Sequence, residues 1–216
     1  MGIKKLEVMK NIYGENTEIA VEINKGLSEQ GVFAVNVMGA PGAGKTSALI
    51  QIIKRLDGIK PFVIEGDIES DIDTRTLKAM GVEAIQINTH GACHLDSPML
   101  MESLKAVDFK EGGILFIENV GNLVCPAEFV IGEHVKLLIC SVTEGSDKPY
   151  KYPLAFEKAD IIILNKCDLK PYLDFDSSFF YNGVKNLNGK APVFEVSAKT
   201  GEGFGDVVKW FEDKLK

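Results

Sequence analysis

A glycine-rich run near residue 40 constrains the fold of this chain more than any other feature of its sequence. Residues 39–46 read Gly-Ala-Pro-Gly-Ala-Gly-Lys-Thr and match the phosphate-binding pattern G-x-x-x-x-G-K-[ST]. A short apolar run precedes the glycines, and an amphipathic helical pattern begins at Lys45. In that setting, backbone N–H groups and the N-terminus of the helix bind phosphates. The sequence therefore predicts a nucleotide site between a strand and a helix.

The residues of this loop have separate predicted roles. Lys45 is expected to reach the β- and γ-phosphates, and the Thr46 hydroxyl is expected to bind Mg²⁺. Both are therefore candidate catalytic residues. The other predicted nucleotide contacts of the loop and the first helical turn come from Gly39, Gly42, Ala43, Gly44 and Ser47.

Short apolar runs rich in Val and Ile alternate with helical patterns from residue 32 onward. Runs that are apolar almost throughout indicate strands buried on both faces of a mainly parallel sheet. Strand–helix alternation predicts a doubly wound α/β domain of about seven strands. The predicted strands are 32–38, 61–65, 82–87, 113–117, 135–142, 160–164 and 193–196. Two helical stripes are Leu49, Ile52, Ile53 and Leu56, and Phe204, Val207, Val208 and Phe211.

The first part of the chain reads differently from the rest. Residues 1–30 carry a loose helical stripe among charges, which Gly14-Glu15-Asn16 is expected to break into two pieces. We predict an N-terminal helical segment over 1–30, packed on a nucleotide-binding domain over 31–216. A partner-binding arm is the alternative interpretation of the helical segment.

Charge and composition exclude several classes of protein. The chain carries 24 Lys and Arg against 31 Asp and Glu, a net charge of −7, which makes it a poor candidate for non-specific nucleic-acid binding. No apolar run approaches the roughly 18 residues of a membrane helix, and the N-terminus has no signal-peptide core. The 4 scattered cysteines do not form a disulfide framework. A cytoplasmic protein that binds neither membrane nor nucleic acid is expected.

Two polar boxes after later strands predict which base is bound. Asn165-Lys166-Cys167-Asp168 resembles the guanine box of GTPases, because the Asp168 carboxylate can accept from two N–H groups that guanine has and adenine lacks. Polar sites of this kind reject analogues whose groups leave them unpaired. Ser197, Ala198 and Lys199 resemble the element whose backbone N–H groups contact the guanine oxygen. We therefore predict GTP and GDP rather than adenine nucleotides.

Acidic residues at two other strand ends predict the magnesium site and a switch. Asp67 and Glu118 close predicted strands, and strand carboxyl ends face the ligand crevice in such sheets. We expect both to act as catalytic residues that bind Mg²⁺ or orient its bound water, and Gly121 to contact the γ-phosphate. Residue 122 is Asn, where Ras-like proteins place a water-orienting Gln, so slow GTP hydrolysis is expected. No role is assigned to Asp71 or Asp73.

A second group of residues has the chemistry of a transition-metal site. Cys93 and His94 are adjacent after one predicted strand, and Cys125 follows the next. Thiolate and imidazole suit Zn²⁺ or Ni²⁺. Three ligands leave a tetrahedron incomplete, so water or a twofold-related subunit would complete it. Cys140 and Cys167 are interpreted as structural.

These motifs together resemble the HypB family of hydrogenase nickel-incorporation GTPases, from about residue 30 to the end. The segment Glu-Asn-Val-Gly-Asn-Leu-Val-Cys-Pro, residues 118–126, is especially specific because it joins a nucleotide switch to a metal cysteine. The resemblance implies a dimerising P-loop NTPase of the SIMIBI class, with Cys93, His94 and Cys125 at the dimer interface. It also implies nickel delivery to the large subunit of [NiFe] hydrogenase, together with a HypA-like zinc protein.

The sequence departs from some members of that family. It has no Cys-x-x-Cys-Gly-Cys run and no histidine-rich tract, since its 3 histidines are His90, His94 and His134. A second tight nickel site and nickel storage are therefore not expected. His90 is interpreted as a loop residue or as one that supports the nearby metal ligands, and His134 as structural.

Two other functions stay open from the sequence. One is a zinc-stapled structural dimer that binds GTP but hydrolyses it too slowly to matter. The other is a urease-type nickel-delivery GTPase, which resembles UreG, although that type arranges its ligands as Cys-Pro-His. Whether hydrolysis changes metal affinity distinguishes the first alternative from a switch.

Overall fold

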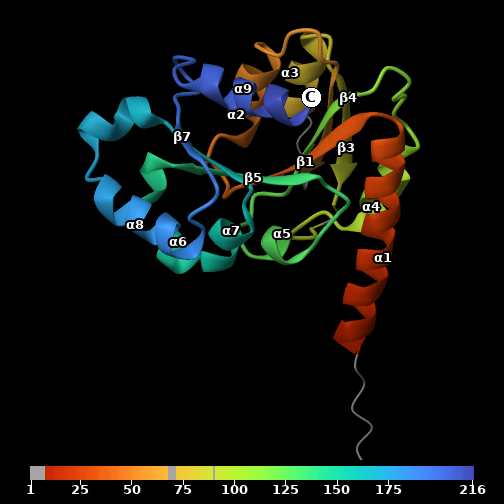
Figure 1. Cartoon of the computed structure of the whole chain (residues 1–216), viewed down its shortest axis with the longest axis horizontal. Coiled ribbons are helices and arrows are strands. Elements are labelled where there is room, and N and C mark those ends of the chain that lie inside the picture. Colours follow the sequence, from red (N-terminus) through yellow and green to blue (C-terminus); the bar gives the residue numbers. More distant parts are fainter. Residues whose placement is uncertain (1–7, 68–71, 90) are drawn as a thin grey trace, which may run out of the picture.

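The computed structural model describes residues 8–67, 72–89 and 91–216, without the side chains of 8–13, 67, 72 and 73. Its centre is a seven-stranded sheet in the order β3-β2-β4-β1-β5-β6-β7, in which every described strand pair is parallel (Figure 1). The strands are β1 (Val32–Met38), β2 (Pro61–Asp67), β3 (Glu83–Asn88), β4 (Gly113–Glu118), β5 (Val135–Ser141), β6 (Ile161–Asn165) and β7 (Val193–Glu195). The predicted doubly wound sheet is confirmed, and the strand bounds differ from the predicted ones by at most two residues.

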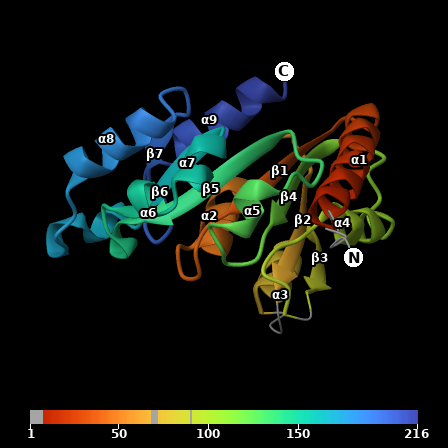
Figure 2. The same ribbon diagram turned by 90° about the horizontal axis from the view of Figure 1, so that it is seen from below.

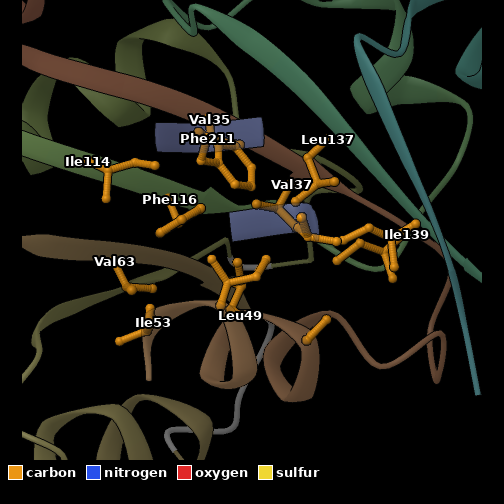
Figure 3. Packing of buried hydrophobic residues seen from close by; sticks show 14 of the residues in the cluster. Val35, Val37, Leu49, Ile53, Val63, Ile114, Phe116, Leu137, Ile139 and Phe211 are labelled. Carbon is orange, nitrogen blue, oxygen red and sulfur yellow. The ribbon is translucent and has the colours of Figure 1, made fainter. Parts of the chain in front are cut away.

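Helices cover both faces of this sheet (Figure 2). One face packs on α2 and α9, where Leu49, Ile53 and Phe211 meet Val35 and Val37 of the central strand (Figure 3). The opposite face packs on α1, α4, α7 and α8. The helices are α1 (Val8–Glu29), α2 (Lys45–Ile53), α3 (Ile72–Ala79), α4 (Ser97–Leu104), α5 (Cys125–Glu128), α6 (Lys148–Lys151), α7 (Pro153–Lys158), α8 (Ser177–Leu187) and α9 (Phe204–Lys214), with 3₁₀ turns η1 (Val142–Glu144) and η2 (Cys167–Tyr172).

The N-terminal helix α1 is continuous from Val8 to Glu29, so the predicted break near Gly14 is wrong. Asn16 does not interrupt the helix, because its side chain is buried in tertiary hydrogen bonds. It donates to the Val130 carbonyl at 2.7 Å and accepts from the Ser97 N–H at 2.9 Å. Packing against the body of the molecule therefore overrides a local tendency to turn. Among the described helices, none has both the length and the apolar composition to cross a membrane.

His134, just before β5, stabilises the junction between α1 and the sheet in its neutral form. Its Nδ1 accepts from the Ala34 N–H at 2.9 Å, and its Nε2 lies 2.9 Å from Ser28 Oγ. The ring stacks on Phe33 with 5.1 Å between centroids. Burial lowers the pKa of His134, and the nearby Glu133 carboxylate opposes this only in part.

We expect the free energy of unfolding to fall as the pH drops below about 6.5. In that range His134 binds a proton in the unfolded chain more readily than in the folded protein, where its pKa is lowered. His134→Asn keeps an acceptor near Nδ1 and removes the titrating ring, so its stability should fall less between pH 7.5 and 5.5. Urea denaturation at both pH values measures this. Equal pH dependence in the two proteins would show that His134 does not contribute.

Candidate functional site

The carboxyl edge of the sheet carries a cleft of about 440 Å³ around the glycine-rich loop. The loop follows β1 and leads into α2, as the sequence predicts. The cleft lies among the ends of β1, β2 and β4, the position at which parallel sheets bind ligands. Its lining is Pro41, Gly42, Gly44, Lys45, Thr46, Ser47, Glu65, Gly66, Glu118, Asn119, Val120 and Gly121.

Gly44 shows why the loop needs glycine at this position. Its φ is +92°, and a Cβ there would lie 2.5 Å from the side-chain nitrogen of Asn165. That nitrogen instead donates to the Ala43 carbonyl at 3.0 Å. The left-handed backbone brings the loop into contact with the segment that follows β6, and directs the N-terminus of α2 toward the cleft.

Two oxygen groups in the cleft have the chemistry that Mg²⁺ binding requires. Thr46 Oγ1 donates to Glu118 Oε1 at 3.0 Å, which places a hydroxyl and a carboxylate together. Mg²⁺ prefers such oxygen ligands. The side chain of Asp67, the third predicted magnesium residue, and those of Asp71 and Asp73 lie outside the described residues, although the Asp67 backbone ends β2.

Glu65 also lines this cleft, although the sequence pattern assigns it no role. It pairs in register with Glu118, is buried, and accepts a hydrogen bond from Thr74 Oγ1 at the start of α3. The signal in the sequence is an acid inside an apolar strand, two residues before Asp67. Recognising its role requires the register between β2 and β4, which the sequence pattern does not show.

A second cavity of about 330 Å³ lies beside the phosphate loop, at the predicted base-binding boxes. Asn165 Oδ1 accepts from the backbone N–H groups of Lys166 and Ala198 at 2.8 and 3.0 Å, so one amide joins both boxes. Asp168 Oδ1 accepts from Ser197 Oγ at 2.6 Å. The lining residues are Gly44, Ser47, Asn165, Lys166, Asp168, Leu169, Ala198 and Lys199.

Lys166 connects the base cavity to the phosphate loop. It has a φ of +61°, the only positive value outside glycine among the described residues. Its Nζ donates to the Gly42 carbonyl at 2.6 Å. The aliphatic part of the side chain therefore crosses between the two cavities, where it can cover a base whose phosphates occupy the loop.

The predicted metal residues come together on the same edge of the molecule. Cys93 Sγ lies 3.1 Å from Cys125 Sγ and 3.4 Å from His94 Nδ1, and the three ligand atoms lie within 4.8 Å of one another. Burial lowers the pKa of His94, which favours the neutral, metal-binding imidazole. Its ring stacks on Phe129 at 4.3 Å. Thiolates and an imidazole at this spacing fit Zn²⁺ or Ni²⁺.

The short helix that begins at Cys125 is held by a buried lysine. Lys136 Nζ of β5 donates to the carbonyls of Pro126, Ala127 and Phe129, at 3.3, 3.2 and 2.7 Å. It also pairs with Glu133 at 3.4 Å. A cation at the carboxyl end of a helix stabilises it. Lys136 therefore fixes the position of α5, a role that the apolar run around it conceals in the sequence.

The other cysteines lie apart from this cluster. Cys140 is fully buried, and burial raises its pKa well above the ordinary value. Burial also raises the pKa of Cys167 to about 11. Their thiols lie near the carbonyls of Ile163 and Leu164. A structural role for both stays a prediction. His90 lies outside the described residues.

The fold and the glycine-rich loop define a P-loop nucleotide-binding protein. A family profile described as CobW/HypB/UreG, nucleotide-binding domain, matches residues 33–195. Hydrogenase maturation factor HypB of Azotobacter vinelandii is 46% identical over 210 residues, covering 97% of this chain and 69% of that protein. The chain belongs to the HypB family of hydrogenase maturation factors.

Solved structures agree with this assignment. The crystal structure of HypB from Helicobacter pylori in complex with nickel has a TM-score of 0.89 and 33% identity, covering 93% of this chain and 95% of that one. HypB from Archaeoglobus fulgidus has a TM-score of 0.88 and 36% identity, covering 94% and 100%. The parallel α/β fold of this chain is therefore the fold of its family.

Proposed function

We propose that this chain is a GTP-hydrolysing metallochaperone that uses its nucleotide state to control a Ni²⁺ or Zn²⁺ site. The observation that carries the proposal is the segment from Glu118 to Cys125. Its first residue accepts a hydrogen bond from Thr46 in the nucleotide cleft, and its last residue lies 3.1 Å from Cys93 in the metal cluster. One short segment therefore belongs to both sites.

The exposure of the metal cluster supports a dimeric site. Cys93 is exposed, and so are Val124 (49%), which directly precedes Cys125, and Val130 (41%), which directly follows the Phe129 ring stacked on His94. Three protein ligands leave a tetrahedral ion incomplete. A second copy of the chain, related by a twofold axis, would bring a second set of the same ligands and cover the apolar side chains.

The cargo and partners follow from the family. The nickel complex of the Helicobacter pylori relative supports Ni²⁺ as cargo, and the ligand set accepts Zn²⁺ as well. We propose nickel insertion into [NiFe] hydrogenase in the cytoplasm, with a HypA-like zinc protein and the hydrogenase large subunit as partners. In the nucleotide site, Thr46, Asp67 and Glu118 would hold Mg²⁺, and Lys45 would contact the phosphates.

Base specificity provides a direct test of the GTP assignment. Asp168→Asn should weaken GTP binding by about a hundredfold or more, because the amide repels one of the two guanine donors that a carboxylate accepts. The same variant should gain affinity for xanthosine triphosphate, whose base offers a carbonyl in place of the amine. Competition titrations with both nucleotides measure the change. Unaltered preference for GTP would show that the base cavity is assigned wrongly.

A further inference from the structure

The segment between the two sites contains two asparagines whose side chains hold the metal loop. Asn119 Oδ1 accepts from the Leu95 N–H at 2.9 Å. Asn122 Nδ2 donates to the Cys93 carbonyl at 3.2 Å. The Cys93–His94 dipeptide is therefore held on both sides, and both amides come from the segment that ends at Cys125.

Asn122 also joins the two cysteine loops to each other. While its Nδ2 binds the Cys93 carbonyl, its Oδ1 accepts from the Val124 N–H at 2.9 Å, directly before Cys125. A single amide thus positions the backbone next to both thiols. Because an amide has fixed geometry, a displacement of Asn122 moves both cysteine loops.

The backbone of Asn122 lies against the phosphate loop. Asn122 forms an antiparallel β-bridge with Gly39, the first glycine of that loop. The preceding Gly121 packs so closely that a Cβ there would lie 2.9 Å from the Pro41 side chain and 3.1 Å from its backbone nitrogen. A shift of the phosphate loop or of Gly121 is therefore transmitted to Asn122 by direct contact.

Asn119 provides a fixed point for this arrangement. It is 1% exposed, its Nδ2 donates to Asn36 Oδ1 at 3.2 Å, and its backbone N–H donates to the Val37 carbonyl. These contacts attach it to the central strand β1. The Leu95 side of the dipeptide is thus anchored to the sheet, whereas the Cys93 side follows the partly exposed Asn122.

We infer that Asn122 is the positioning residue that couples the nucleotide state to the metal site, which rests on the proposed switch function. Its side chain binds the Cys93 carbonyl and the Val124 N–H. It sets the relative position of Cys93 and Cys125, and its backbone senses the phosphate loop. Asn122 occupies the place of the water-orienting Gln in Ras-like proteins, but its amide is bound to the cysteine loops.

The test is titration of Zn²⁺ and, separately, Ni²⁺ into the full-length chain bound to GDP and to a non-hydrolysable GTP analogue. The readout is the ratio of metal affinities in the two states, which a merely structural role would leave unchanged. Allosteric ratios are typically about 5- to 150-fold. We expect Asn122→Ala to retain metal binding in both states, with a ratio that falls to about twofold or less.

Asn122→Asp tests one of the two hydrogen bonds by itself. It keeps the acceptor for the Val124 N–H and removes the donor to the Cys93 carbonyl. The ratio should fall in this variant too. The matched control is Asn24→Ala, since the Asn24 side chain also binds backbone groups of another segment, the carbonyls of Gly132 and Glu133. Its ratio should equal that of the wild type.

The outcomes separate the inference from the function on which it rests. Equal metal affinities in the two nucleotide states of the wild type would overturn the switch and the inference together. A wild-type ratio that survives in both Asn122 variants would overturn the inference alone. A ratio that also collapses in Asn24→Ala would show that any lost amide bridge has this effect, and would likewise contradict a specific role of Asn122.

Discussion

Replacing Lys45 with alanine is expected to reduce GTP hydrolysis by about 10²- to 10³-fold, the usual cost of removing one group that stabilises transition-state charge. Lys45 is the lysine of the phosphate loop, and its side chain lines the cleft beside Gly39. Lys45 is the only cationic residue in the described lining of that cleft, so no other side chain there can neutralise the charge on the transferred phosphoryl group. Phosphate release under single-turnover conditions measures the chemical step without product release.

Lys54→Ala is the matched control for this change. Lys54 is the exposed residue that caps the other end of α2, so it tests loss of a lysine from the same helix without loss of the phosphate contact. Its hydrolysis rate should equal that of the wild type. A Lys45 variant within a few-fold of the wild type would exclude the proposed catalytic role, provided that thermal unfolding shows both variants folded.

The second large effect concerns the metal cluster. Cys93→Ala and Cys125→Ala should each lower Zn²⁺ and Ni²⁺ affinity by more than about a hundredfold, since loss of a direct ligand exceeds the 10- to 100-fold cost of losing a supporting residue. Each substitution leaves one thiol and one imidazole within reach of an ion. Competition with a chromophoric chelator, and the sulfur-to-nickel absorption band, measure the two metals.

The remaining cysteines serve as controls of the same chemical type. Cys140→Ala and Cys167→Ala remove thiols that lie outside the cluster and are held protonated by burial. Metal affinity should be unaltered in both. Equal loss of metal from the Cys140 variant would contradict the division of the cysteines into ligands and structural residues.

Local patterns in the sequence predicted the parts of the site that depend on neighbours along the chain. Each of these parts is a short run of residues that can be recognised without knowing its tertiary contacts. They are the glycine-rich loop, the box at Asn165 and the strands. Residues that follow successive parallel strands meet at one edge, so the approach of Cys125 to Cys93 was also predictable.

The parts that were missed depend on register and on tertiary contacts. Glu65 joins the cleft because β2 pairs with β4 in a particular register. Lys136 supports α5 because its side chain crosses from β5 to a neighbouring loop. The continuity of α1 follows from hydrogen bonds between Asn16 and residues far along the chain. None of these contacts has a periodic signature, so no local pattern predicts them.

In the proposed function, the nucleotide controls both the metal site and the assembly of the chain. The most direct measurement is the solution mass of the wild-type protein by light scattering, with GDP and with a non-hydrolysable GTP analogue, each with and without one equivalent of Zn²⁺ or Ni²⁺. We expect a dimer with the GTP analogue and a weaker association with GDP. Metal should further strengthen the GTP-state dimer, because linkage is reciprocal. The same mass in every condition would contradict nucleotide control of assembly. A constant dimer would then favour a zinc-stapled structural protein, and a constant monomer would favour a simple GTPase.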